Sequence, residues 1–156
     1  MSDAISACGF SDEAEYVEKT AAGRRRALHQ SSALGMESVL RDELAEVWQE
    51  CSKPNWDGYG AVAVRERTYR NAERFLLALP LGTRAPSVGA EPDGQITFEW
   101  RHSRRRILSV SVSPEDELHY AALLGPSRTC GTEPFFGEVP RLIRELIGRV
   151  YDVESV

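Results

Sequence analysis

Alternation of apolar and polar residues between positions 86 and 124 constrains the fold of this chain more than any other feature. A period of two is typical of β-strands that bury one face and expose the other. Asp93 and Gly94 separate two such segments and form a strong hairpin signal, because glycine supplies the positive φ that a tight turn needs. The apolar members of the two central segments are Ile96, Phe98, Trp100, Leu108, Val110 and Val112, and the expected outward set in the second is Ser109, Ser111 and Ser113.

These patterns predict four strands, over residues 87–92, 95–101, 106–113 and 118–124. Short polar turns join consecutive strands. The sheet is therefore expected to be an antiparallel meander with one buried face.

Three further segments carry apolar residues at three- and four-residue spacing, which predicts amphipathic helices over residues 36–52, 64–79 and 139–150. Pro54 and Pro80 follow the first two, as expected at helix ends, and Pro140 lies in the first turn of the third. The expected fold is α+β, with N-terminal helices, a four-stranded antiparallel β-meander and a C-terminal helix packed on one face of the sheet. Residues 35–151 form this single domain, and residues 1–34 are a weakly patterned N-terminal segment.

Composition is that of an ordinary globular protein: 156 residues, of which 42% are hydrophobic and 28% are charged. No apolar run approaches the roughly 18 residues of a membrane span, so no membrane partner is expected. The first residues show neither a basic segment nor a long apolar one, and no secretory signal is expected. The three cysteines are far apart and form neither a disulfide framework nor a CxxC zinc pattern, which favours a cytoplasmic location.

Negative charge is concentrated in the first third of the chain. Residues 1–50 contain ten acidic and five basic residues and so carry the whole net charge of −5. Asp42, Glu43 and Glu46 are expected on the outer face of the first helix, where they would meet a basic protein partner. The competing interpretation is a face that serves solubility alone.

The stretch RHSRRR at residues 101–106 lies between two predicted strands and is expected to be a hairpin tip. Arg101, Arg104, Arg105 and Arg106 would then form one charged patch for an acidic protein surface or for phosphates. Charged side chains also keep a solvated hairpin from aggregating. Because the chain is acidic overall, tight binding to nucleic acid is not expected, but a nucleic-acid-associated regulator that uses this hairpin is the alternative function.

The stretch NWDGYG at residues 55–60 is a compact corner after the first helix. Trp56 is expected to anchor it, Asp57 to accept backbone hydrogen bonds, and Gly58 to permit a positive φ. The rival interpretation makes Asp57 a catalytic or metal-binding carboxylate. A single carboxylate does not complete either kind of site, so we expect no cofactor and no metal here.

An enzyme is the third hypothesis and would use Cys130 with His119, or Glu133 as a base. Cys130 and Glu133 follow the last predicted strand and are expected in a loop. None of the common nucleophile, zinc-protease or phosphate-binding motifs is present. The sequence therefore predicts a protein that is not an enzyme.

Four stretches together resemble a group of small uncharacterised bacterial proteins: NWDGYGA at 55–61, FLLALP at 75–80, EPDGQITFEW at 91–100 and GTEPFF at 131–136. The resemblance covers about residues 36–150. It carries no catalytic residue, and it implies antitoxin-like, phage-inhibitor or regulatory roles. The chain is accordingly expected to be a small protein-binding module that acts through protein–protein contacts.

Overall fold

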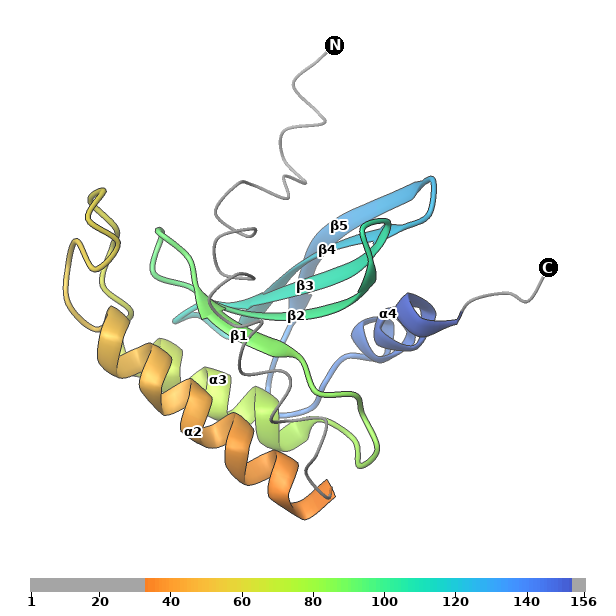
Figure 1. Cartoon of the computed structure of the whole chain (residues 1–156), viewed down its shortest axis with the longest axis horizontal. Coiled ribbons are helices and arrows are strands. Elements are labelled where there is room, and N and C mark those ends of the chain that lie inside the picture. The colour runs from red at the N-terminus through yellow and green to blue at the C-terminus, as the bar shows by residue number, and fades with distance from the viewer. Residues whose placement is uncertain (1–32, 153–156) are drawn as a thin grey trace, which may run out of the picture.

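The computed structural model describes residues 33–152, with side chains from residue 36. The N-terminal segment predicted over residues 1–34 lies almost wholly outside this range. The described part contains three helices and five strands (Figure 1). In chain order they are α2 (Ala33–Cys51), α3 (Glu66–Ala78), β1 (Ser87–Ala90), β2 (Ile96–Ser103), β3 (Arg106–Val112), β4 (Glu117–Leu124), β5 (Ser127–Pro134) and α4 (Arg141–Tyr151).

The strands form one antiparallel sheet in the order β1-β2-β3-β4-β5, so every strand is hydrogen-bonded to its neighbours in sequence. The predicted α+β class, the meander and the C-terminal helix on the sheet are confirmed. The prediction of four strands is wrong. The stretch after the fourth strand is itself a strand, β5, whose eight residues pair with β4 from Ser127 to Pro134.

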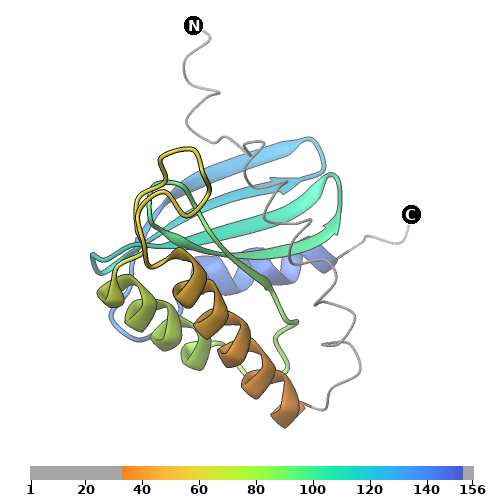
Figure 2. The ribbon, with the colours of Figure 1, turned by 60° about the vertical axis from the view of Figure 1, so that its left-hand side comes forward.

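The helices lie on one side of the sheet (Figures 1 and 2). Phe75 of α3 is the centre of the aromatic packing, with its ring 5.1 Å from Phe98, 6.4 Å from Trp100 and 5.9 Å from Phe135. α2 lies beside α3, and the rings of Trp48 and Tyr69 stack at 4.6 Å. α4 covers the rest of this inner face with the buried residues Ile143, Leu146, Ile147 and Val150.

The opposite, outer face of the sheet is polar. One row across the strands consists of Thr97, Ser111, His119 and Thr132. The Thr97 and Ser111 hydroxyls are 2.9 Å apart, and Ser111 donates to the Glu91 carboxylate at 2.8 Å. Ser111 is thus on the predicted outward side but is buried, and its hydroxyl is hydrogen-bonded there.

A buried amide ties α3 to the turn between β3 and β4. Asn71 Nδ2 lies 3.1 Å from the carbonyl oxygen of Ser113, 3.4 Å from that of Pro114 and 3.3 Å from that of Glu115. The residue is 5% exposed. Its side chain therefore satisfies turn carbonyls that the sheet leaves without a strand partner.

Within residues 33–152, none of the helices has the length and apolar character needed to cross a bilayer.

Candidate functional site

The loop between α2 and α3, here the corner loop (residues 52–65), has a backbone that few sequences can adopt. Three of its residues have positive φ: Asn55 at 61°, Gly58 at 78° and Gly60 at 85°. Glycine adopts this region without a Cβ penalty, and asparagine is among the side chains that tolerate it best. The local sequence Asn-Trp-Asp-Gly-Tyr-Gly therefore places suitable residues at all three positions.

Side chains inside the loop fix this backbone. Asp57 Oδ1 accepts the N–H of Tyr59 at 2.8 Å and that of Ala61 at 3.0 Å. Asn55 Oδ1 accepts the N–H of Gly60 at 2.7 Å, and the Asn55 N–H donates to the Ala61 carbonyl at 2.8 Å. These bonds agree with the predicted structural role of Asp57. Trp56 is half-buried, and its indole N–H donates to the Val62 carbonyl at 3.0 Å.

A second loop braces the corner loop from the side. The Val62 N–H donates to the Pro92 carbonyl, in the turn between β1 and β2, at 2.7 Å. At Gly94 of that turn φ is 89° and a Cβ would lie 3.0 Å from the Ala63 carbonyl oxygen, so glycine is strongly favoured there. The two loops lie side by side at one end of the molecule (Figure 1). The positive φ predicted for Gly94 is confirmed at 89°.

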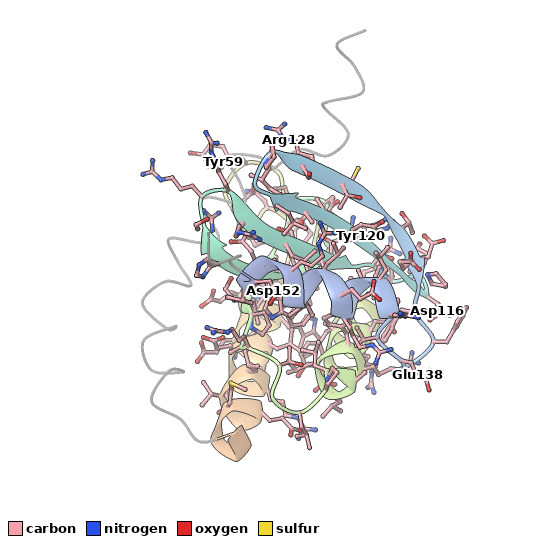
Figure 3. The ribbon with its side chains drawn as sticks, turned by 90° about the vertical axis from the view of Figure 1, so that its right-hand side faces the viewer. Tyr59, Asp116, Tyr120, Arg128, Glu138 and Asp152 are labelled. Carbon is pink, nitrogen blue, oxygen red and sulfur yellow. The ribbon has the colours of Figure 1, made fainter. Side chains whose placement is uncertain are left out.

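Tyr59 stands at the tip of the corner loop and is 94% exposed. Figure 3 shows it at the edge of the molecule, away from the core. Sequence reasoning expected an aromatic residue of this corner to be buried and did not single out Tyr59 as a site residue. The available signal was its position between two glycines, which carry no side chain to pack over it. The corner loop therefore presents a large side chain to solvent from a fixed backbone.

The predicted acidic face of α2 is only partly present. Asp42 and Glu46 are exposed, but Glu43 is 9% exposed. The prediction that the three acids share one outer face is wrong for Glu43. It lies three residues after Leu40 and next to Leu44, both in the core, so the helical turn carries it toward the buried stripe.

The four arginines of the RHSRRR stretch do not form a single patch. Arg101 lies in β2 and its Nε is 3.1 Å from a Glu99 carboxylate oxygen. Arg106 lies in β3 and donates to the Arg149 carbonyl in the last turn of α4 at 2.7 Å. Register places them on opposite faces of the sheet, and only Arg104 and Arg105 form the exposed turn. The predicted hairpin tip is therefore two residues long, with a register shift between Arg101 and Ser103.

The candidate nucleophile and bases also occupy other positions than predicted. Cys130 and Glu133 lie in β5 rather than in a loop, and successive strand positions place them on opposite faces. His119 is on the same face as Cys130, with Nδ1 3.0 Å from the Thr132 hydroxyl. Cys130 is disulfide-bonded, so its sulfur is not present as a nucleophilic thiol. The expectation that the cysteines form no disulfide is therefore wrong for Cys130. Cys51 is a buried free thiol.

Two grooves flank the segment 80–84, at the other end of α3 from the corner loop. One, of about 400 Å³, lies against the end of α4 and is lined in part by Arg84, Arg144, Tyr151 and Asp152. The Arg84 guanidinium lies 4.4 Å from the Tyr151 ring centroid. The other, of about 180 Å³, is lined by residues of α2, the end of α3 and the segment 79–86, which includes Leu81, a side chain that is 96% exposed. Among the described residues, neither lining contains a His, Cys or Ser.

Among residues 33–152, no cluster of three or more His, Cys, Asp or Glu side chains is arranged to hold a metal ion. The candidate functional site is therefore the braced corner loop and the tyrosine that it displays.

Comparison with protein-family models, with curated proteins and with solved structures found no match. The resemblance of the corner motif to small bacterial proteins accordingly stays a prediction.

Proposed function

We propose that this protein is a binding module whose corner loop recognises a protein partner through Tyr59. The observation that carries the proposal is the combination of a 94%-exposed tyrosine with a backbone held by internal hydrogen bonds. Tyrosine is enriched among the residues that dominate protein–protein binding energy, because it buries a large area and also forms a hydrogen bond.

Rigidity is what separates this tyrosine from an ordinary exposed side chain. Single exposed aromatic residues are common and need no explanation. A flexible loop loses conformational entropy when it binds, whereas a loop already fixed in its bound form does not. Asn55 and Asp57 supply that fixation before any partner arrives, and the Trp56 indole adds a hydrogen bond to the Val62 carbonyl within the loop. The whole side chain of Tyr59 is then available to fill a pocket on the partner.

The nucleic-acid alternative has less support from the geometry. Of the four arginines in RHSRRR, Arg106 binds a helix carbonyl and Arg101 lies beside Glu99. Each phosphate that a protein neutralises on B-DNA contributes about 0.9 to the salt dependence of binding. A turn with Arg104 and Arg105 alone would therefore give a shallow slope, and an Arg104→Ala/Arg105→Ala variant should change duplex or single-strand binding little at physiological salt. Submicromolar binding that this variant abolishes would instead favour the regulator.

The experiment compares three tagged baits in cell extract: the wild type, Tyr59→Ser and Leu81→Ser. Leu81 is 96% exposed and lies beside the grooves rather than in the corner loop, so its variant removes a similar amount of exposed apolar surface elsewhere. We expect a partner that the wild type and Leu81→Ser retain and Tyr59→Ser loses. With that partner purified, Tyr59→Ser should raise the dissociation constant at least about 30-fold, as is typical when a tyrosine at the centre of a protein–protein interface is truncated. Equal affinity of all three proteins would refute the role of the loop.

A further inference from the structure

The outer face of the sheet contains buried side chains, although α2, α3 and α4 all lie on the opposite side (Figures 1 and 2). Strand pairing places Arg101, Ile107, Leu123 and Arg128 side by side in one row of this face, across β2, β3, β4 and β5. Ile107 is 5% exposed, and Leu123 is half-buried. In the next row of the same face, Glu99 is 6% exposed.

Neighbouring strands do not account for this burial by themselves. Side chains stand roughly perpendicular to a sheet, so residues in the same row cover the flanks of a side chain but not its outer end. An isoleucine on a solvated face would keep part of its surface in water. The burial of Ile107 therefore indicates a cover that the described helices do not supply.

The disulfide of Cys130 indicates where that cover is attached. Cys130 lies on the outer face, and the cysteine to which it is bonded is outside the described residues. The sequence contains three cysteines, of which Cys51 is a free thiol. The remaining one is Cys8, which belongs to the segment that precedes α2.

We propose that residues 1–32 dock on the outer face of the sheet and cover Ile107 and Leu123, held there by a disulfide between Cys8 and Cys130. The proposal does not depend on the corner loop. It assigns the outer face to a segment of the same chain, so that this face is an internal contact rather than a surface for a separate partner.

The length of the chain permits this arrangement. The stretch between Cys8 and Ala33 can extend to about 80 Å. A strand of eight residues, such as β5, is about 26 Å long. The segment can therefore leave the start of α2, pass around the sheet and reach Cys130 without being fully extended.

The residues near Cys8 have the chemical character that this face requires. Ile5 and Phe10 lie within three residues of Cys8 and are the large apolar side chains nearest to it in the sequence. Residues 1–18 contain five acidic residues and no basic one, whereas Arg128 lies two residues from Cys130 on the same face. A segment bonded to Cys130 would thus bring both apolar side chains and negative charge to the row of Ile107.

The covalent bond also reduces the entropic cost of docking. A segment of this length loses conformational entropy when it becomes ordered on a surface. A tether raises the effective concentration of the segment at the surface, so weak contacts suffice to hold it there. The bond between residues 8 and 130 further closes a long loop, which restricts the unfolded chain and favours the folded one.

The first measurement locates the disulfide. The full-length protein, purified without reductant, is denatured in the presence of a thiol-blocking reagent, digested, and mapped by mass spectrometry. We expect a linked pair of peptides that contain Cys8 and Cys130, from a molecule of 17.4 kDa, and a blocked Cys51. The proposal would be overturned if Cys130 were bonded to Cys130 of a second copy or to a small thiol, or were blocked as a free thiol.

The second measurement tests the cover in the same protein by nuclear Overhauser effects from side-chain methyl groups. The methyls of Ile107 and Leu123 should show effects to protons of residues 1–32. Val110 is the matched control in the same strand, since it faces the helices and should show none. If Ile107 and Leu123 showed none either, docking would be refuted even where the Cys8–Cys130 bond is present.

The third measurement compares the wild type with Cys8→Ser, each with and without a dithiol reductant. The dithiol is oxidised to a disulfide, and the two thiols of Cys8 and Cys130 are formed in exchange. Reduction should lower the melting temperature of the wild type by at least about 5 °C, because the closed loop is lost from the unfolded chain. Cys8→Ser should melt with the reduced wild type and should not respond to the dithiol. A wild type that the dithiol leaves unchanged, or an equal shift in Cys8→Ser, would contradict the tether.

Discussion

The Asp57 carboxylate fixes the backbone of Tyr59, since its Oδ1 accepts the Tyr59 N–H at 2.8 Å and, two residues on, the Ala61 N–H at 3.0 Å. One side-chain oxygen thus joins Tyr59, which is 94% exposed, to Ala61, which is buried where the chain returns to the core.

Asp57→Ala should loosen the corner loop without unfolding the protein, because it removes the acceptor for two backbone donors. The expected loss in unfolding free energy is about 1 kcal/mol, measured by urea denaturation. The amides of Tyr59 and Ala61 should exchange faster. Asp57→Asn is the matched control, since its amide oxygen still accepts both bonds. Equal exchange rates in the wild type and Asp57→Ala would show that the carboxylate does not order the loop.

Asn71→Asp should destabilise the protein by about 2 to 3 kcal/mol, because a buried carboxylate cannot donate to the three turn carbonyls and repels them. Asn71→Ala should cost less, since it removes the donor without placing a charge. Thermal unfolding of the two variants shows which of them is less stable. A smaller loss for the aspartate than for the alanine would mean that the turn carbonyls do not depend on this amide.

Gly131→Ala should cost about 1 to 2 kcal/mol of stability, because the new methyl would lie 2.8 Å from the Tyr120 hydroxyl oxygen and the ring must move. In a Tyr120→Leu background the same alanine should be nearly neutral. A double-mutant cycle on the unfolding free energies measures this coupling. Additive effects of the two changes would exclude the Tyr120 ring as the cause.

Arg106→Met should lower stability by about 1 kcal/mol, because it removes the charged donor to the Arg149 carbonyl at the end of α4. Because methionine keeps much of the apolar part of the arginine side chain, the loss of stability measures the contribution of the guanidinium group. The matched control is Arg105→Met in the exposed turn, for which no change in melting temperature is expected. If both variants lost a comparable amount of stability, the cause would be the change in surface charge rather than the hydrogen bond to Arg149.

Cys51 should resist alkylation in the folded protein at pH 8. Burial, with a smaller contribution from Glu50, raises the pKa of its thiol to about 11, so the reactive thiolate is scarce. Because the folded pKa lies above the unfolded one, this thiol contributes stability below pH 9 that is lost as pH rises toward 11. Iodoacetamide labelling followed by peptide mass spectrometry, with Cys51→Ala as the reference for stability, tests both statements. Rapid labelling of native Cys51 at pH 8 would contradict them.

Segments whose burial follows a regular period were predictable from the sequence. The strands with Phe98 and Val110 alternate because helices cover one of their faces, and α4 shows its helical period because it covers the sheet. β5 extends beyond those helices and has no buried face to impose a period. Its sequence Ser-Arg-Thr-Cys-Gly-Thr-Glu-Pro therefore lacks the pattern that identifies a strand, and the sequence alone predicts a loop there.

The candidate site was less predictable because it depends on which way single side chains point. Arg101 and Arg106 are close together in the sequence, but they lie on opposite faces of the sheet. Glu43 is polar yet lies beside the buried stripe of its helix. For Tyr59, the sequence indicated a tight corner and the glycines that permit it. The orientation of the ring depends on the hydrogen bonds of Asn55 and Asp57, which no periodicity reveals.

Because α4 is the last described element and covers the inner face of β2, β3 and β4, the order of biosynthesis matters for this fold. Chains emerge from the ribosome from the N-terminus, so the strands leave it before the helix that shields them. The nascent sheet must therefore carry the apolar side chains of Leu108 and Val110 without their final cover until α4 has left the ribosome.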